Sequence, residues 1–114
     1  MKKLIAVFAI VLFAGVAGAG QEYSTGKHLK LVMARQSTVP MVEIMKNLSD
    51  HCPNITMTTN PQKSDYMLYA GGWSGEYRFM VIAKGGDTLY ATKTVLLSNA
   101  VKDVCKFLNA RNPE

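Results

Sequence analysis

Two cysteines and two histidines are the residues of this 114-residue chain whose types most often do chemistry. Cys52 lies in SDHCPNIT and Cys105 lies in VKDVCKFL. A zinc site generally needs three or four ligands, and His51 is the only ligand-like neighbour of Cys52. Neither His28 nor His51 belongs to a nucleophile motif such as G-x-S-x-G. We therefore expect no catalytic residue, no metal and no cofactor, and we ask whether the cysteines have a structural role.

The first nineteen residues have the pattern of a secretory signal peptide. MKKLIAVFAIVLFAGVAGA begins with two lysines, continues as an apolar run and ends in small residues. The apolar run is shorter than the roughly 20 residues of a membrane span. We expect cleavage after Ala19, no transmembrane span in the mature chain, and a periplasmic or secreted bacterial protein; an uncleaved N-terminal anchor is the alternative.

Export bears on the two cysteines, because disulfides persist in oxidising compartments. The segment 40–51 has apolar residues at helical spacing, namely Met41, Ile44, Met45 and Leu48, and Cys52 continues this stripe. A second stripe consists of Leu97, Ala100, Val101, Val104 and Leu108, with Cys105 beside it. If both helices lie side by side on one sheet, the cysteines come within bridging distance. The prediction is a Cys52–Cys105 disulfide; two unlinked core thiols, or a catalytic or metal role, are the alternatives.

The remaining pattern predicts strands and turns. Residues 28–35, 55–58, 65–70, 76–83 and 88–94 are rich in strand formers. We expect a glycine-dense turn over 71–75 and a tight hairpin over 84–87. Ser37 or Thr38 is expected to cap the first helix, and Ser98 to cap the second, which runs to about residue 110.

The expected fold is one α+β domain. A signal peptide over 1–19 and a mature tail over 20–27 precede a domain over 28–114. The element order is β-α-β-β-β-β-α, with a mixed sheet of four to five strands and both helices on one face. The other face of the sheet is then open to solvent.

Aromatic residues gather in the antiparallel part of this sheet, and alternation prevents all of them from facing the helices. In residues 76–83, Tyr77, Phe79 and Val81 share one side, and Arg78, Met80 and Ile82 share the other. A sheet face of this apolar character predicts a docking surface. The alternative is that the N-terminal tail and long side chains cover it. The candidate surface comprises Tyr69, Trp73, Arg78, Met80, Ile82 and Tyr90.

Phosphate binding and nucleic-acid binding fit the sequence less well. The glycines of 71–75 join two strands, whereas phosphate-binding loops open a helix. Removal of Lys2 and Lys3 with the leader lowers the net charge from +5 to +3. Nucleic-acid binding needs clustered Lys and Arg, so we expect no nucleic-acid partner.

Three motifs, CPNITMT, NPQKSDYMLYAGG and LSNAVKDVCKFL, resemble segments of small uncharacterised exported bacterial domains. More loosely, the chain is similar to the α+β units of curli-secretion-channel-type lipoproteins and to the N-terminal domain of the Tol-associated propeller protein. The resemblance carries no catalytic residue, and the lipoprotein cysteine of those relatives is missing here. It implies an envelope or secreted accessory domain.

Taken together, these observations predict an exported, non-enzymatic binding or assembly domain whose partner is a protein, either an envelope component or a second copy. A small secreted hydrolase or enzyme inhibitor is the alternative, and it would require a cleft lined by His28 or His51 with a carboxylate nearby.

Overall fold

The computed structural model describes residues 26–113. The expected signal peptide and most of the expected mature tail lie outside these residues. The described chain forms a five-stranded mixed sheet and two α-helices, as the sequence predicts. The elements are β1 (Leu29–Met33), α2 (Met41–His51), β2 (Ile55–Met57), the 3-10 helix η2 (Pro61–Lys63), β3 (Tyr66–Trp73), β4 (Glu76–Ile82), β5 (Thr88–Thr94) and α3 (Leu97–Arg111).

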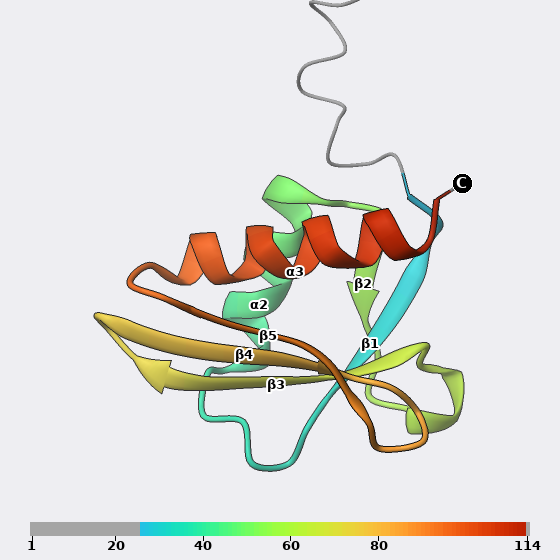
Figure 1. Ribbon diagram of the computed structural model, residues 1–114, viewed down its shortest axis with the longest axis horizontal. Helices are drawn as coiled ribbons and strands as arrows, with labels where there is room; N and C mark the ends of the chain where they lie inside the picture. Colours follow the sequence, from blue (N-terminus) through green and yellow to red (C-terminus); the bar gives the residue numbers. More distant parts are fainter. Residues whose placement is uncertain (1–25, 114) are drawn as a thin grey trace, which may run out of the picture.

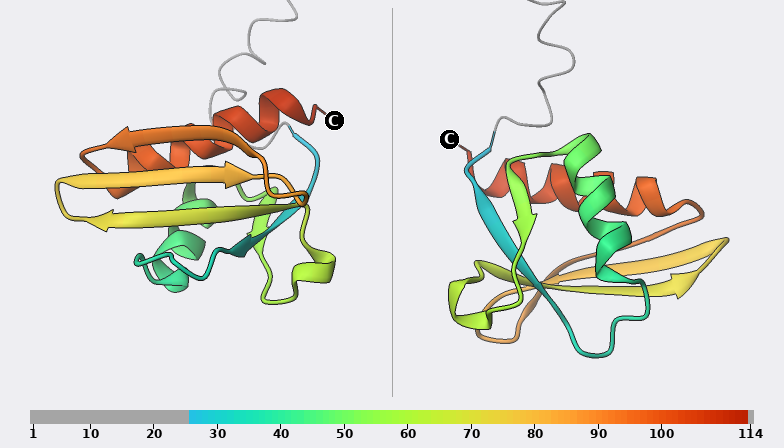
Figure 2. Two further views of the ribbon diagram at one scale, coloured as in Figure 1. Left: turned by 60° about the horizontal axis from the view of Figure 1, so that its bottom comes forward. Right: turned by 180° about the vertical axis from the view of Figure 1, so that it is seen from behind.

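The sheet has the strand order β2-β1-β3-β4-β5. β1 runs parallel to both β2 and β3, and β3, β4 and β5 form an antiparallel meander. Both helices lie on one side of the sheet, above β3, β4 and β5 in Figure 1, and the view from behind in Figure 2 agrees. Because no described helix covers the opposite side, this face of the sheet is open.

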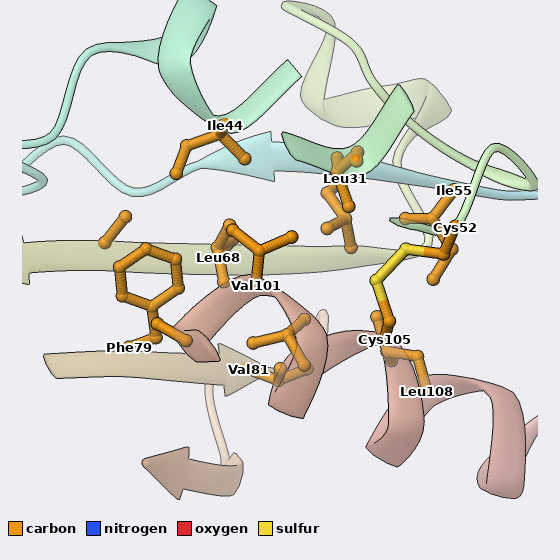
Figure 3. Packing of buried hydrophobic residues seen from close by; sticks show 14 of the residues in the cluster. Leu31, Ile44, Cys52, Ile55, Leu68, Phe79, Val81, Val101, Cys105 and Leu108 are labelled. Carbon is orange, nitrogen blue, oxygen red and sulfur yellow. A yellow bond between two sulfur atoms is a disulfide. The ribbon is translucent and has the colours of Figure 1, made fainter. Parts of the chain in front are cut away.

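The core lies between the helices and the sheet. Ile44 and Leu48 of α2 and Val101 of α3 are buried against sheet residues such as Leu68 and Phe79, and Figure 3 shows buried side chains of both layers converging. These positions recur at helical spacing in the helices and alternate in the strands, which is why one face of each element is apolar. Met45, expected in the same stripe, is instead exposed at the edge of the helix pair.

A disulfide joins Cys52, at the C-terminal end of α2, to Cys105 in the middle of α3. The Cα atoms are 6.2 Å apart, within the range that a disulfide accepts. Both cysteines are fully buried, and Figure 3 shows the bridge beside Ile55 and Leu108. The bridge therefore fixes the two helices side by side over the sheet.

The chain after β1 closes the free edge of β3. β1 pairs with β3 only as far as Leu68. Beyond that point, the N–H of Thr38 donates to the carbonyl of Ala70 (2.9 Å), and the Oγ of Ser37 accepts from the N–H of Ala70 (3.0 Å). The hydroxyl of Thr38 accepts from the N–H of Gly72 (3.1 Å) and donates to its carbonyl (3.3 Å). Side-chain hydroxyls here take the place of a neighbouring strand.

These contacts correct the expected cap of the first helix. Ser37 and Thr38 do not cap α2, because their hydroxyls are bonded to β3; Pro40 is the N-cap residue and makes no side-chain bond. Ser98 does not cap the second helix either. α3 begins one residue before Ser98, with Leu96 as an N-cap that has no side-chain bond.

The expected turn over 71–75 is shorter in the structure, because β3 continues to Trp73 and only residues 74 and 75 connect it to β4. Gly72 has a φ of +100°, and a Cβ at this position would collide with the carbonyl oxygen of Glu76. Glycine is therefore needed at Gly72 for close approach of the two strands.

The described ends of the chain meet. Gly26 forms an antiparallel bridge with Pro113, and the N–H of Lys27 donates to the carbonyl of Asn112 (3.0 Å). The buried side-chain amide of Asn54 donates to the carbonyl of Lys27 (2.9 Å) and so ties this end to the loop after α2. Both described ends lie at the C-terminal end of α3 (Figure 1).

Breaking the disulfide should lower the stability of the domain. Its sequence separation of 53 corresponds to about 4 kcal/mol of chain entropy, an upper value because strain and residual structure subtract from it. We expect Cys52→Ala/Cys105→Ala to unfold at lower urea concentration than the oxidised protein and to be insensitive to reductant. Equal urea midpoints for the wild type with and without reductant, or two reactive thiols in the native protein, would contradict the bridge.

Candidate binding surface

The open face of the sheet consists of the side chains that alternate with the core residues. On β4, Phe79 and Val81 are buried beneath the helices, whereas Arg78, Met80 and Ile82 point the other way. The pairing of β3 with β4 places Tyr69 opposite Met80 and Met67 opposite Ile82. Methionine, tyrosine and isoleucine therefore form the centre of this face.

A shallow hollow of about 420 Å³ lies over this centre. Its floor is made by side chains of β3 and β4, and the segment after β1 makes one wall. It is lined by Ala34, Gln36, Met67, Tyr69, Met80 and Ile82. The hollow is predominantly apolar, and it is broad and open, unlike the enclosed clefts that usually hold small-molecule substrates.

The ring of Tyr69 lies along β3 over Gly71. A Cβ at Gly71 would collide with the hydroxyl end of this ring, so the glycine leaves the space that the tyrosine occupies. A tyrosine that covers a glycine in a strand supplies the packing that the glycine lacks. The aromatic ring thus lies flat on the open face instead of projecting from it.

Charged groups border this apolar centre. Arg78 and Lys93 are direct cross-strand partners on β4 and β5. An ion pair joins Arg78 to Glu76 on the same strand. Lys93 is exposed beside Arg78, whose charge is offset by Glu76, so Lys93 adds a positive charge to this part of the face. This side of the open face therefore favours partners with negative groups.

Tyr90 does not belong to the open face. Its Cα partner is the buried residue Val81, and its ring stacks on Phe107 of α3 with centroids 4.7 Å apart. On the same side of β5, the hydroxyl of Thr92 donates to the carboxylate of Asp103 (2.6 Å). Tyr90 therefore joins β5 to α3 and lies on the helix side of the sheet, apart from the predicted surface residues of β3 and β4.

Trp73 is exposed but lies apart from the centre of the open face. It is the last residue of β3, beside the turn to β4, and the chain after β5 passes the same end of the molecule. Val95 and Leu96 in that chain are also exposed, although they were not among the predicted surface residues. The sequence could have indicated them, because Val95, Leu96 and Leu97 are three consecutive apolar residues where a strand connects to a helix, and such connections are usually polar.

The two histidines stand near the end that carries the chain termini. His28 is exposed just before β1, and His51 is the half-buried last residue of α2. Within residues 26–113, no group of three or more His, Cys, Asp or Glu side chains is placed to hold a metal ion. No helix of this region is long and apolar enough to span a bilayer.

A second apolar groove, of about 210 Å³, lies between α2 and the edge strand β2. The exposed side chain of Met45 and the side chains of Pro53 and Met57 are among those that line it. It is smaller than the hollow on the open face and presents only a three-residue strand edge.

Comparisons with models of protein families, with curated proteins and with solved structures give no match to this chain. The resemblance to exported bacterial domains therefore stays a prediction. Any inference about function rests on the contacts of the described residues.

Truncation of a side chain to alanine should lower the unfolding free energy more on the helix side of the sheet than on the open face. Tyr90→Ala removes a ring stacked on Phe107 and should cost about 2 to 3 kcal/mol of unfolding free energy. Met80→Ala, on the open face, should cost about 1 kcal/mol or less, because its side chain is only partly buried. Urea unfolding of both variants checks this, and a larger loss for Met80→Ala would contradict the assignment of faces.

Proposed function

We propose that this protein is an exported, non-enzymatic domain that binds another protein through the open face of its sheet. The observation that carries the proposal is the contrast between the two faces. One is closed by two disulfide-linked helices, whereas the other leaves Met67, Tyr69, Met80 and Ile82 around an open hollow. A monomer of this size rarely leaves such a surface without a partner.

Two observations support export to the periplasm or out of the cell. A buried disulfide is maintained where the environment is oxidising, as in the bacterial periplasm or outside the cell. The pattern of the first nineteen residues is that of a signal peptide. The resemblance to exported accessory domains agrees with the same location.

The chemistry of the open face favours a protein partner. Tyrosine, methionine and arginine are enriched in protein interfaces, and methionine adapts its shape to different partners. Tyr69, Met80 and Arg78 are neighbours on this face. A flat apolar centre with charged groups at its side matches the usual division of an interface into an apolar core and a polar rim.

Charge favours a different protein over a second copy. The described residues contain 11 Lys and Arg against 6 Asp and Glu. Two identical faces would each present Lys93, and the carboxylate of Glu76 beside it is already paired with Arg78, so their association would gain little electrostatic complementarity. We therefore propose an envelope protein with an acidic rim as the partner. The secreted hydrolase or enzyme inhibitor has no specific observation among residues 26–113 in its favour.

Met80→Glu tests this proposal, because it puts a carboxylate in the centre of the face without removing a core residue. We expect it to weaken binding of the envelope partner by about tenfold or more. The measurement is quantitative affinity capture from periplasmic and envelope extract, with each retained protein confirmed by binding in purified form.

Val42→Glu is the matched control, since Val42 is exposed on α2 in the other layer of the molecule. Both variants should keep the circular-dichroism spectrum of the wild type. Equal retention of the same partner by wild type and Met80→Glu, or no partner for the wild type, would rule out the open face as the binding surface.

A further inference from the structure

Exposed apolar side chains gather at one end of the molecule. Trp73, Val95 and Leu96 leave 71%, 65% and 57% of their surface exposed. Trp73 pairs with Glu76 of β4, and Tyr77, the next residue of β4, pairs with Thr94 of β5. Trp73 and Val95 therefore lie on either side of Glu76. Two strand spacings make this separation about 10 Å. Figures 1 and 2 show the β3–β4 turn and the β5–α3 connection at the same end.

We call Trp73, Val95 and Leu96 the apolar tip. The stability of the fold does not explain why these positions are apolar. Leu96 is the N-cap of a fifteen-residue helix, a position where Ser, Thr, Asn or Asp is more stable. The hydroxyl of Thr94 donates to the carbonyl of Leu96 (2.7 Å), which holds this short turn in place. A leucine held in solvent at a helix cap breaks a local rule, and such exceptions tend to mark functional sites.

Cations stand directly behind the apolar tip. Arg78 and Lys93 lie in the next row of the open face, beside Gly71. Two residues along a strand correspond to about 7 Å. The row of the tip therefore carries Trp73, Val95 and, between them, the carboxylate of Glu76, which is paired with Arg78. The charge of Lys93, one row behind, remains to attract an anionic surface.

We propose that the apolar tip inserts into the surface of a bilayer that contains anionic phospholipid. Side chains of peripheral proteins enter the boundary between headgroups and acyl chains by about 5–10 Å, so a row about 7 Å behind the tip lies at the level of the phosphates. Tryptophan prefers this boundary, and Lys and Arg are attracted to anionic headgroups. The excess of positive charge over residues 26–113 complements such a surface.

The size of the tip favours lipid over protein. A stable protein interface buries about 800 Å² on each partner, more than three side chains on two turns provide. A bilayer closes around a small protrusion, so no matching surface is needed. This inference does not depend on the protein partner proposed above, because the hollow around Met80 lies at a different part of the open face.

The single tryptophan of the chain makes the test direct, since Trp73 emission reports on the tip alone. Protein purified from the exported fraction, with the same N-terminus in every variant as fixed by intact mass, is titrated with vesicles. One set contains equal parts phosphatidylglycerol and phosphatidylcholine, and the other contains phosphatidylcholine alone. We expect the emission to shift to shorter wavelength with the anionic vesicles and to be quenched by brominated acyl chains.

Variants separate the tip from the rest of the surface. Val95→Ser/Leu96→Ser keeps the reporter and should weaken partitioning by about tenfold or more. Lys93→Gln should weaken it by about fivefold. Met45→Ser is the matched control, because Met45 is an exposed methionine on α2 and belongs to neither the tip nor the open face, and its partitioning should equal that of the wild type.

Leu96→Ser alone guards against a folding artefact. Serine is a better N-cap, so this variant should melt at higher temperature while it binds vesicles less tightly. The inference is overturned if Trp73 emission does not respond to anionic vesicles, if phosphatidylcholine alone gives an equal response, or if Val95→Ser/Leu96→Ser partitions as the wild type does. An emission shift that follows protein concentration without vesicles would assign the tip to a second copy and would also overturn it.

Discussion

The disulfide between Cys52 and Cys105 holds the end of α2 against the middle of α3, and much of the arrangement depends on this contact. Both helices then cover the same side of a five-stranded sheet. A domain with so short a chain has little core to spare, so a covalent link offsets part of its conformational entropy. Because the core lies between the helices and one side of the sheet, the side chains on the opposite side of β3 and β4 are not part of the core.

The sheet itself is completed by side chains where strands are missing. Ser37 and Thr38 bond to Ala70 and Gly72 with their hydroxyls, and the ring of Tyr69 fills the space left by Gly71. Both devices lie on β3, the central strand that carries the parallel and the antiparallel parts of the sheet. They let β3 extend beyond its partner β1 and so bring Trp73 to the end of the molecule.

Much of the fold could be predicted from the sequence, because it rests on periodicity. The apolar stripes of the two helices and the alternation in residues 76–82 are local patterns, and they placed both cysteines and the two faces of β4. The side of Tyr90 was also open to prediction, because counting back from the expected turn over 84–87 pairs Tyr90 with Val81, as the structure does. The register shift between Val81 and Ile82 lies on the turn side of this pair and does not change the face of Tyr90.

The helix caps and the extent of β3 escaped prediction because tertiary contacts decide them. Ser37, Thr38 and Ser98 have the residue types of caps, but the hydroxyls of the first two bond to a strand far along the chain. Similarly, the glycines of 71–75 suggest a turn unless the ring of Tyr69 is known to lie over Gly71. Alternation along β4 places Arg78, Met80 and Ile82 on the open face, and their role in binding a partner stays a prediction.

The bridge between Gly26 and Pro113 has a practical consequence for attaching labels to the protein. Because the two described ends adjoin each other at the pole opposite Trp73, a fluorescent label or fusion protein attached after Pro113 would sit far from the β3–β4 turn. Immobilisation through that end would orient every molecule with the same pole outward.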